Sequence, residues 1–77
     1  MYSRATCGLC DEAREVILAA RSEHPFEFQE LFIDGRDDLE RRYGLRVPVV
    51  LVDGEEEFER HVPPQGLREA VAGRLRD

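Results

Sequence analysis

A helix-like segment flanked by two strand-like segments occupies residues 1–33 of this 77-residue chain and constrains its fold most strongly. Met1 to Arg4 is typical of the end of a strand, Cys7 to about Ser22 has apolar residues at helical spacing, and Phe26 to Ile33 is rich in aromatic and β-branched residues. His24-Pro25 ends the helix, because the residue before a proline avoids the helical region. A strand, a crossover helix and a second strand form a right-handed parallel unit. The chain is therefore predicted to be an α/β protein.

The rest of the chain predicts a short helix, a β-hairpin and a closing helix. These elements span Asp37 to Tyr43, the strands Pro48 to Val52 and Glu55 to His61, and the segment that follows Pro63-Pro64. Asp37 is the expected N-cap of the short helix, with Gly44 just past its end. Asp53-Gly54 is typical of a tight hairpin turn. The element order β-α-β-α-β-β-α predicts one domain over residues 1–77, folded as a small α/β sandwich.

The apolar spacing also predicts the core. One face of the first helix carries Leu9, Ala13, Val16, Ile17 and Ala20. Other expected core residues are Phe26, Phe28, Phe32, Leu39, Tyr43, Phe58, Leu67, Ala70, Val71 and Leu75. The first strand should lie in the middle of the sheet, yet only Met1 to Thr6 precede the first cysteine. Either this central strand is short, near the low end of strand length, or the natural chain begins further upstream.

The two cysteines, Cys7 and Cys10, form a Cys-Gly-Leu-Cys motif where the first strand ends and the first helix begins. At the N-terminus of a helix, unpaired N–H groups and the helix dipole favour an anion. The pKa of the Cys7 thiol is therefore expected to fall below the value of about 8.5 that a free thiol has. Cys10 lies one turn later and is expected to be more buried. This spacing favours a redox site in which Cys7 is the nucleophile and Cys10 resolves the mixed disulfide.

Two other interpretations of the motif remain open. A purely structural disulfide would stabilise the fold little, because closing so short a loop contributes only about 2 kcal/mol on the chain-entropy model. A zinc site would need two further ligands, and His24 and His61 lie far from Cys10 along the chain. Charged neighbours act in opposite directions: Asp11 and Glu12 disfavour a thiolate on Cys7. Arg4 and Arg14 are the expected counter-charges.

The composition limits the partners. The net charge of −6 and the pI of about 4.9 make binding to nucleic acid or to anionic membranes unexpected. The N-terminus has no apolar signal segment, and no apolar run approaches the roughly 18 residues of a membrane span. A cytoplasmic monomer is expected, and the paired cysteines then favour catalysis or metal binding over a structural bridge.

Two short segments carry a resemblance to a known family. The run Cys-Gly-Leu-Cys-Asp-Glu-Ala, from Cys7 to Ala13, resembles the small bacterial glutaredoxin-like proteins of the thioredoxin superfamily. Arg46-Val47-Pro48-Val49-Val50 is similar to the Thr-Val-Pro segment that carries the cis-proline of that superfamily. The resemblance implies a four-stranded mixed sheet in the order 2-1-3-4 with helices on both faces. It also implies a cis Val47–Pro48 bond facing the cysteines, where the Val47 backbone would pair with an extended substrate.

The predicted substrate-binding residues are Val47, Pro48, Arg4, Gly8 and Leu9, beside the catalytic Cys7 and Cys10. Classical glutaredoxins have a proline and an aromatic residue where this chain has Gly8 and Leu9. They also have a Gly-Gly pair and an aspartate that hold glutathione, where this chain has the stretch from His61 to Gly66. These departures leave the identity of the thiol partner open.

The expected function is a cytosolic thiol–disulfide oxidoreductase that reduces protein disulfides or mixed disulfides with a small thiol. A small thiol or a reductase would recharge it, with no metal or organic cofactor. One alternative is a dedicated electron donor recharged by thioredoxin reductase. Another is a non-catalytic module of the same fold whose cysteines hold zinc or an iron–sulfur cluster. A cluster usually needs four ligands, so a second subunit or added thiols would have to contribute.

Overall fold

The computed structural model describes residues 1–75, and the side chain of Leu75, predicted for the core, lies outside the described part. The elements are β1 (Tyr2–Ser3), α1 (Gly8–Glu23), β2 (Leu31–Phe32), α2 (Asp37–Tyr43), β3 (Val49–Val52), β4 (Glu55–Glu59) and α3 (Pro64–Leu75). The strands lie in the order β2-β1-β3-β4. β1 is parallel to β2, whereas the pairs β1–β3 and β3–β4 are antiparallel. The predicted element order and mixed 2-1-3-4 sheet are confirmed.

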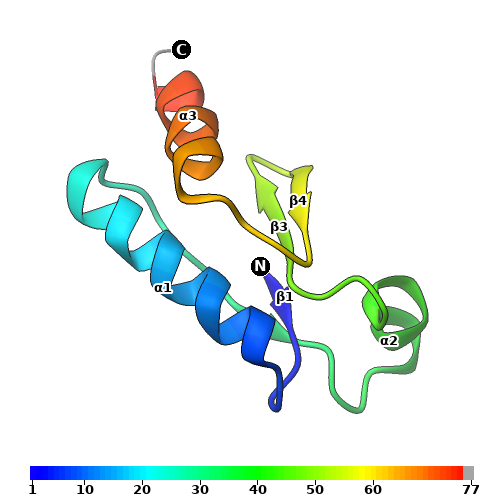
Figure 1. The fold of residues 1–77 in the computed structure, drawn as a ribbon. Helices are drawn as coiled ribbons and strands as arrows, with labels where there is room; N and C mark the ends of the chain where they lie inside the picture. The colour runs from blue at the N-terminus through cyan, green and yellow to red at the C-terminus, as the bar shows by residue number, and fades with distance from the viewer. Residues whose placement is uncertain (76–77) are drawn as a thin grey trace.

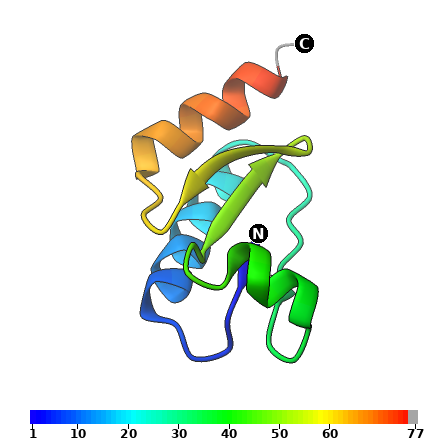
Figure 2. The ribbon, with the colours of Figure 1, turned by 90° about the vertical axis from the view of Figure 1, so that its right-hand side faces the viewer.

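Helices cover both faces of this sheet. α1 and α3 lie on one side, and α2 lies on the other (Figure 1), so that the view in Figure 2 has α2 in front of the strands. The cluster under α1 and α3 consists of Ala13, Ile17, Ala20, Val50, Val62, Leu67 and Val71. The cluster under α2 consists of Ile33, Tyr43 and Val49. Successive strand residues point to opposite faces, so Val49 and Val50 each serve a different cluster. Within residues 1–75, no helix is long and apolar enough to span a bilayer.

The inner face of α1 is formed by Cys10, Ala13, Ile17 and Ala20, at intervals of three and four residues. α1 ends at Glu23, with His24 as its C-cap immediately before Pro25, as predicted. The prediction that Leu9 belongs to the buried face is wrong, because its side chain is 40% exposed. The inner face begins at Cys10, and neighbouring residues on a helix point about 100° apart, which turns Leu9 outward.

The second strand is much shorter than predicted. Phe26 to Ile33 is extended in sequence character, but only Leu31–Phe32 pairs as a strand. The reason is the length of β1, which pairs with this segment only through Tyr2 and Ser3. The Met1 ammonium adds one hydrogen bond to the Gln29 carbonyl oxygen, at 2.7 Å. The predicted burial of Phe32 is also wrong, since this side chain is 44% exposed. Ile33 takes the inward position under α2, and alternation turns Phe32 to the other face at the sheet edge.

The hairpin forms at the predicted dipeptide, where Asp53 and Gly54 have φ angles of 51° and 82°. Positive φ at both central residues is what the favoured hairpin turn requires. β4 ends at Glu59, earlier than predicted, because Arg60 has a φ of 66° and its N–H turns back to the Pro48 carbonyl oxygen at 2.8 Å. In α2, Asp37 is the first helical residue rather than the N-cap. Arg36 occupies the cap position without a side-chain bond.

A groove of about 480 Å³ lies beyond the N-terminal end of β1. Met1, the 26–29 segment and residues 50–53 contribute to its walls. β3 pairs with β1 only at Tyr2 and Val49, so the rest of β3 has a strand on one side alone. Burial of the Met1 ammonium at the end of this groove lowers its pKa. Residues added before Met1 as a continuation of β1 would therefore enter this groove.

We expect that three or four alternating apolar residues added before Met1 will raise the melting temperature. They would pair with β3 and bury apolar side chains, and each buried side chain of this kind contributes about 1.5–3 kcal/mol. In a domain of this size, each kcal/mol raises the melting temperature by about 4–8 °C. Thermal unfolding followed by circular dichroism measures the effect, with a Gly-Ser extension of equal length as the control. An unchanged or lower melting temperature would count against a short central strand.

Candidate active site

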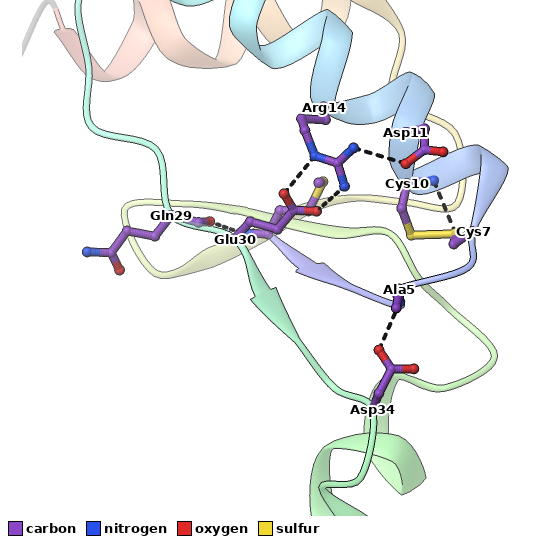
Figure 3. Close-up of polar contacts among 9 residues, drawn as sticks. Ala5, Cys7, Cys10, Asp11, Arg14, Gln29, Glu30 and Asp34 are labelled. Atoms are coloured by element: carbon purple, nitrogen blue, oxygen red, sulfur yellow. Dashed lines mark hydrogen bonds and ion pairs between the residues drawn. A yellow bond between two sulfur atoms is a disulfide. The ribbon is translucent and has the colours of Figure 1, made fainter.

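Cys7 and Cys10 form a disulfide at the start of α1, with their Cα atoms 5.2 Å apart (Figure 3). Cys7 is half-buried, and its neighbours Thr6 and Gly8 are exposed. Cys10 is fully buried. The difference in burial agrees with the expectation that Cys10 is the more buried of the two cysteines.

The N-terminus of α1 is directed at the Cys7 sulfur. Cys7 is the N-cap residue in extended conformation, with φ −150° and ψ 108°, and its Sγ accepts a hydrogen bond from the Cys10 N–H at 3.1 Å. The Asp11 N–H donates to the Cys7 carbonyl oxygen at 3.1 Å, which closes the first turn. A side-chain acceptor at an N-cap satisfies one of the unpaired helix N–H groups. A thiolate at this atom would gain the same contact together with the favourable end of the helix dipole.

The Val47–Pro48 segment lies at the end of β1 from which the cysteine loop departs. Its peptide bond is cis. Tyr2 pairs with Val49 in the antiparallel ladder, and continuing this register places Arg4 opposite Val47. Pro48 is fully buried and Val47 is half-buried. The topology therefore brings two predicted substrate-binding segments to one edge of the sheet.

The side chain of Arg4 fastens the cysteine loop to α2. Its Nε donates to the Gly44 carbonyl oxygen and its Nη1 to Glu40 Oε1, both at 3.3 Å. A Cβ on Gly44 would clash with the Glu40 carbonyl and the Arg4 guanidinium, so this contact requires glycine there. The guanidinium of Arg4, expected to offset the acidic residues near Cys7, is thus bonded at the end of α2.

Asp34 holds the same loop from the other side, a role that the sequence did not reveal. Its Oδ2 accepts a hydrogen bond from the Ala5 N–H at 2.8 Å (Figure 3). Because β1 and β2 are parallel, their carboxyl ends meet at one edge of the sheet. An aspartate just after β2 can therefore reach the chain just after β1. That rule is the signal by which the sequence could have indicated this contact.

A second unpredicted contact joins α1 to the chain before β2. Arg14 donates to Glu30 through Nε at 2.7 Å and through Nη2 at 2.6 Å, and its Nη1 donates to Asp11 Oδ1 at 2.9 Å. Hydrogen bonding to Glu30 is the main cause that raises the pKa of Arg14. The bond from Arg14 in turn lowers the pKa of Glu30. Of the two arginines expected near the cysteines, Arg14 is the one bonded to the first turn of α1.

Of the remaining residues considered in the sequence, Gly8 and Leu9 lie in the first turn of α1, and the two histidines lie elsewhere. Gly8 and Leu9 are both exposed beside Cys7, and a Cβ on Gly8 would meet open space. His24 caps the far end of α1, and His61 follows β4. Within the part of the chain that the structure describes, no three His, Cys, Asp or Glu side chains come together as a set of metal ligands.

Comparison with known proteins agrees with the two-cysteine site. A family model described as "Glutaredoxin-like domain (DUF836)" matches residues 1–72. "Uncharacterized protein Rv0508" of Mycobacterium tuberculosis (strain ATCC 25618 / H37Rv) and "Uncharacterized protein Mb0520" of Mycobacterium bovis (strain ATCC BAA-935 / AF2122/97) are each 31% identical over 77 residues. Each alignment covers 94% of this chain and 79% of the relative. No solved structure matches the chain. With the matched region spanning both cysteines and all four strands, the chain belongs to the glutaredoxin-like domain family (DUF836).

Proposed function

We propose that this protein is a cytoplasmic thiol–disulfide oxidoreductase that works through a Cys7/Cys10 dithiol. One observation carries the proposal: the sulfur of the half-buried Cys7, at the N-cap of α1, accepts a helix N–H and is bonded to the sulfur of the fully buried Cys10 one turn later. The fit of the chain to a glutaredoxin-like family supports a thiol redox role. The difference in burial supports an order of events in which Cys7 is the nucleophile and Cys10 the resolving residue.

The reaction needs the reduced pair. The Cys7 thiolate attacks one sulfur of a substrate disulfide, so that a Cys7–substrate disulfide forms and the other substrate sulfur leaves as a thiolate. Cys10 then loses its proton and attacks the Cys7 sulfur, which forms the Cys7–Cys10 disulfide and releases the second substrate thiolate. The two leaving thiolates take up protons from water. The protein dithiol has supplied two electrons, and the substrate disulfide has been reduced to two thiols.

The residues around Cys7 are proposed to hold the substrate chain. The Val47 backbone lies at the end of β1, where an extended substrate segment could pair with it as an added strand. Gly8 and Leu9 directly follow Cys7 in the sequence and are both exposed, and a Cβ on Gly8 would meet open space. Pro48 follows Val47 and is fully buried. Arg4 contributes indirectly, by holding the cysteine loop against α2.

A reductant must return two electrons to the disulfide after each cycle, and a small thiol or a reductase is proposed for this step. No metal or organic cofactor is required. The stretch from His61 to Gly66 has no Gly-Gly pair of the kind that holds glutathione in classical glutaredoxins. That departure favours a second candidate, a dedicated electron donor recharged by thioredoxin reductase.

Turnover of a protein–glutathione mixed disulfide tests the proposal. NADPH consumption is followed in two reactions, one with glutathione and its reductase and one with thioredoxin reductase alone. Turnover in either reaction supports the oxidoreductase, and the faster reaction identifies its source of electrons. Absence of turnover in both, with zinc or an iron–sulfur cluster bound in stoichiometric amount, would instead support the metal-binding module.

A further inference from the structure

Arg14 lies on the same side of α1 as the redox pair. Residues four apart on a helix are neighbours on its surface, so the side chain of Arg14 follows directly after that of Cys10. Figure 3 shows the Arg14 guanidinium beside Asp11, on the side of the helix where the disulfide lies. The bond from Arg14 Nη1 to Asp11 Oδ1, at 2.9 Å, fixes this arrangement.

Glu30 holds the guanidinium in that place. Two parallel N–H···O bonds of 2.7 and 2.6 Å join the Arg14 and Glu30 side chains, which is the strong bidentate form of this pair. The Glu30 side chain is 13% exposed and comes from the segment before β2. An arginine without such an anchor would extend its charged end into water. The anchor instead keeps a positive charge at the first turn of α1.

The position of the Arg14 charge matters because acidic side chains lie near Cys7. Asp11 stands in the first turn, and its side chain is 68% exposed when bonded to Arg14. Asp34 accepts from the Ala5 N–H close to Cys7, and Glu12 is exposed. Arg4, the other nearby cation, is bonded to Glu40 and Gly44. Asp11 and Asp34 thus place negative charge beside the cysteine loop, and Arg14 is bonded to Asp11 in the first turn of α1.

We propose that Arg14, anchored by Glu30, is a positioning residue that neutralises Asp11 and thereby stabilises the thiolate on Cys7. The inference rests on the proposed function, and it adds the groups that regulate the reactivity of the pair. Reduction of the disulfide takes up two electrons and, with Cys7 ionised, one proton, which goes to Cys10. Groups that stabilise the Cys7 thiolate favour this reduced form, so they make the disulfide a stronger oxidant.

The test measures alkylation of Cys7 by iodoacetamide in the reduced protein across a range of pH. In Arg14→Gln the Asp11 carboxylate is no longer neutralised. We expect alkylation at pH 7 to slow by about three- to tenfold, because a nearby counter-charge has been lost. The dithiol–disulfide equilibrium should shift toward the disulfide by the same three- to tenfold. The reduction potential would then be more negative by about 15–30 mV.

Two further variants and a control separate electrostatics from folding. Asp11→Asn changes an exposed side chain and should speed alkylation, because it removes the negative charge. The double variant Asp11→Asn/Arg14→Gln should return close to the wild-type rate, since the two effects depend on each other. Arg68→Gln is the matched control. Arg68 lies in α3 and pairs at 3.1 Å with Glu23, the last residue of α1, so this variant also removes one positive charge from an ion pair but far from the cysteines.

The outcomes distinguish this inference from the proposed function. If Arg14→Gln slows alkylation no more than Arg68→Gln, or Asp11→Asn does not speed it, the positioning role is overturned even where wild-type turnover is normal. A lowered melting temperature with an unchanged pH profile would show that the ion pair only joins α1 to the chain before β2, which also overturns the inference. Absence of wild-type turnover, with the alkylation pattern as expected, would contradict the oxidoreductase function and leave the charge arrangement standing.

Discussion

Replacing Cys7 with serine is expected to abolish turnover, while the fold is kept. A serine hydroxyl remains protonated at neutral pH, so no nucleophile stands at the N-cap of α1, although the oxygen can still accept the Cys10 N–H. Cys10 cannot take over, because it is fully buried. NADPH-coupled reduction of a mixed disulfide measures the loss, and circular dichroism checks the fold.

Cys10→Ser is the matched variant, with a different expected result. Cys7 can still attack a substrate, but no second sulfur resolves the product, so a Cys7–substrate disulfide should accumulate. Mass spectrometry of the intact protein detects that adduct. Reduction of small-thiol adducts should survive where a second small thiol resolves the intermediate. Turnover retained by Cys7→Ser would disprove the assigned order of attack.

Ile33→Ala is expected to have the largest effect on stability. Ile33 is fully buried under α2 and forms one cluster with Tyr43 and Val49. Truncating such a side chain costs about 2–5 kcal/mol, whereas a chain of this length has a total stability of about 4–12 kcal/mol. The melting temperature should fall by more than about 10 °C, with a matching loss in urea unfolding.

Ile33→Val provides the control for that substitution. It keeps the β-branched shape, removes one methyl group and should cost only about 0.5–1.5 kcal/mol. Thermal and urea unfolding of the two variants in parallel give the comparison. If Ile33→Ala stayed within about 1 kcal/mol of the wild type, the packing of α2 against the sheet would have to be looser than described.

Local patterns in the sequence were enough to predict those elements whose stability is decided locally. α1 follows from apolar residues at helical spacing and from the proline after His24, and the hairpin follows from Asp53-Gly54. The placement of Cys7 at a helix N-terminus follows from the same reasoning. The sheet order followed instead from the family resemblance.

Features that depend on distant segments were not predictable in this way. β2 is short because its partner β1 pairs with it only through Tyr2 and Ser3, whatever the strand propensity of residues 26–30. The contact between Arg14 and Glu30 joins residues 16 positions apart. Predicting this contact would require knowing that the chain before β2 passes beside the start of α1. Leu9 was wrongly predicted to be buried. Helical spacing alone does not decide the burial of a residue at the end of a helical face, because that burial depends on what packs against it.

The reduction potential of the Cys7–Cys10 pair, measured with metal content on the same sample, tests the central claim most directly. The protein is equilibrated in thiol buffers of defined ratio, and the oxidised fraction is read by mass spectrometry after alkylation. A metal-free protein with a potential between about −180 and −270 mV would fall among working dithiol carriers, as the account predicts. A pair that forms no disulfide in oxidising buffer, or that holds a stoichiometric metal ion, would contradict the account and make Cys7 and Cys10 a ligand set.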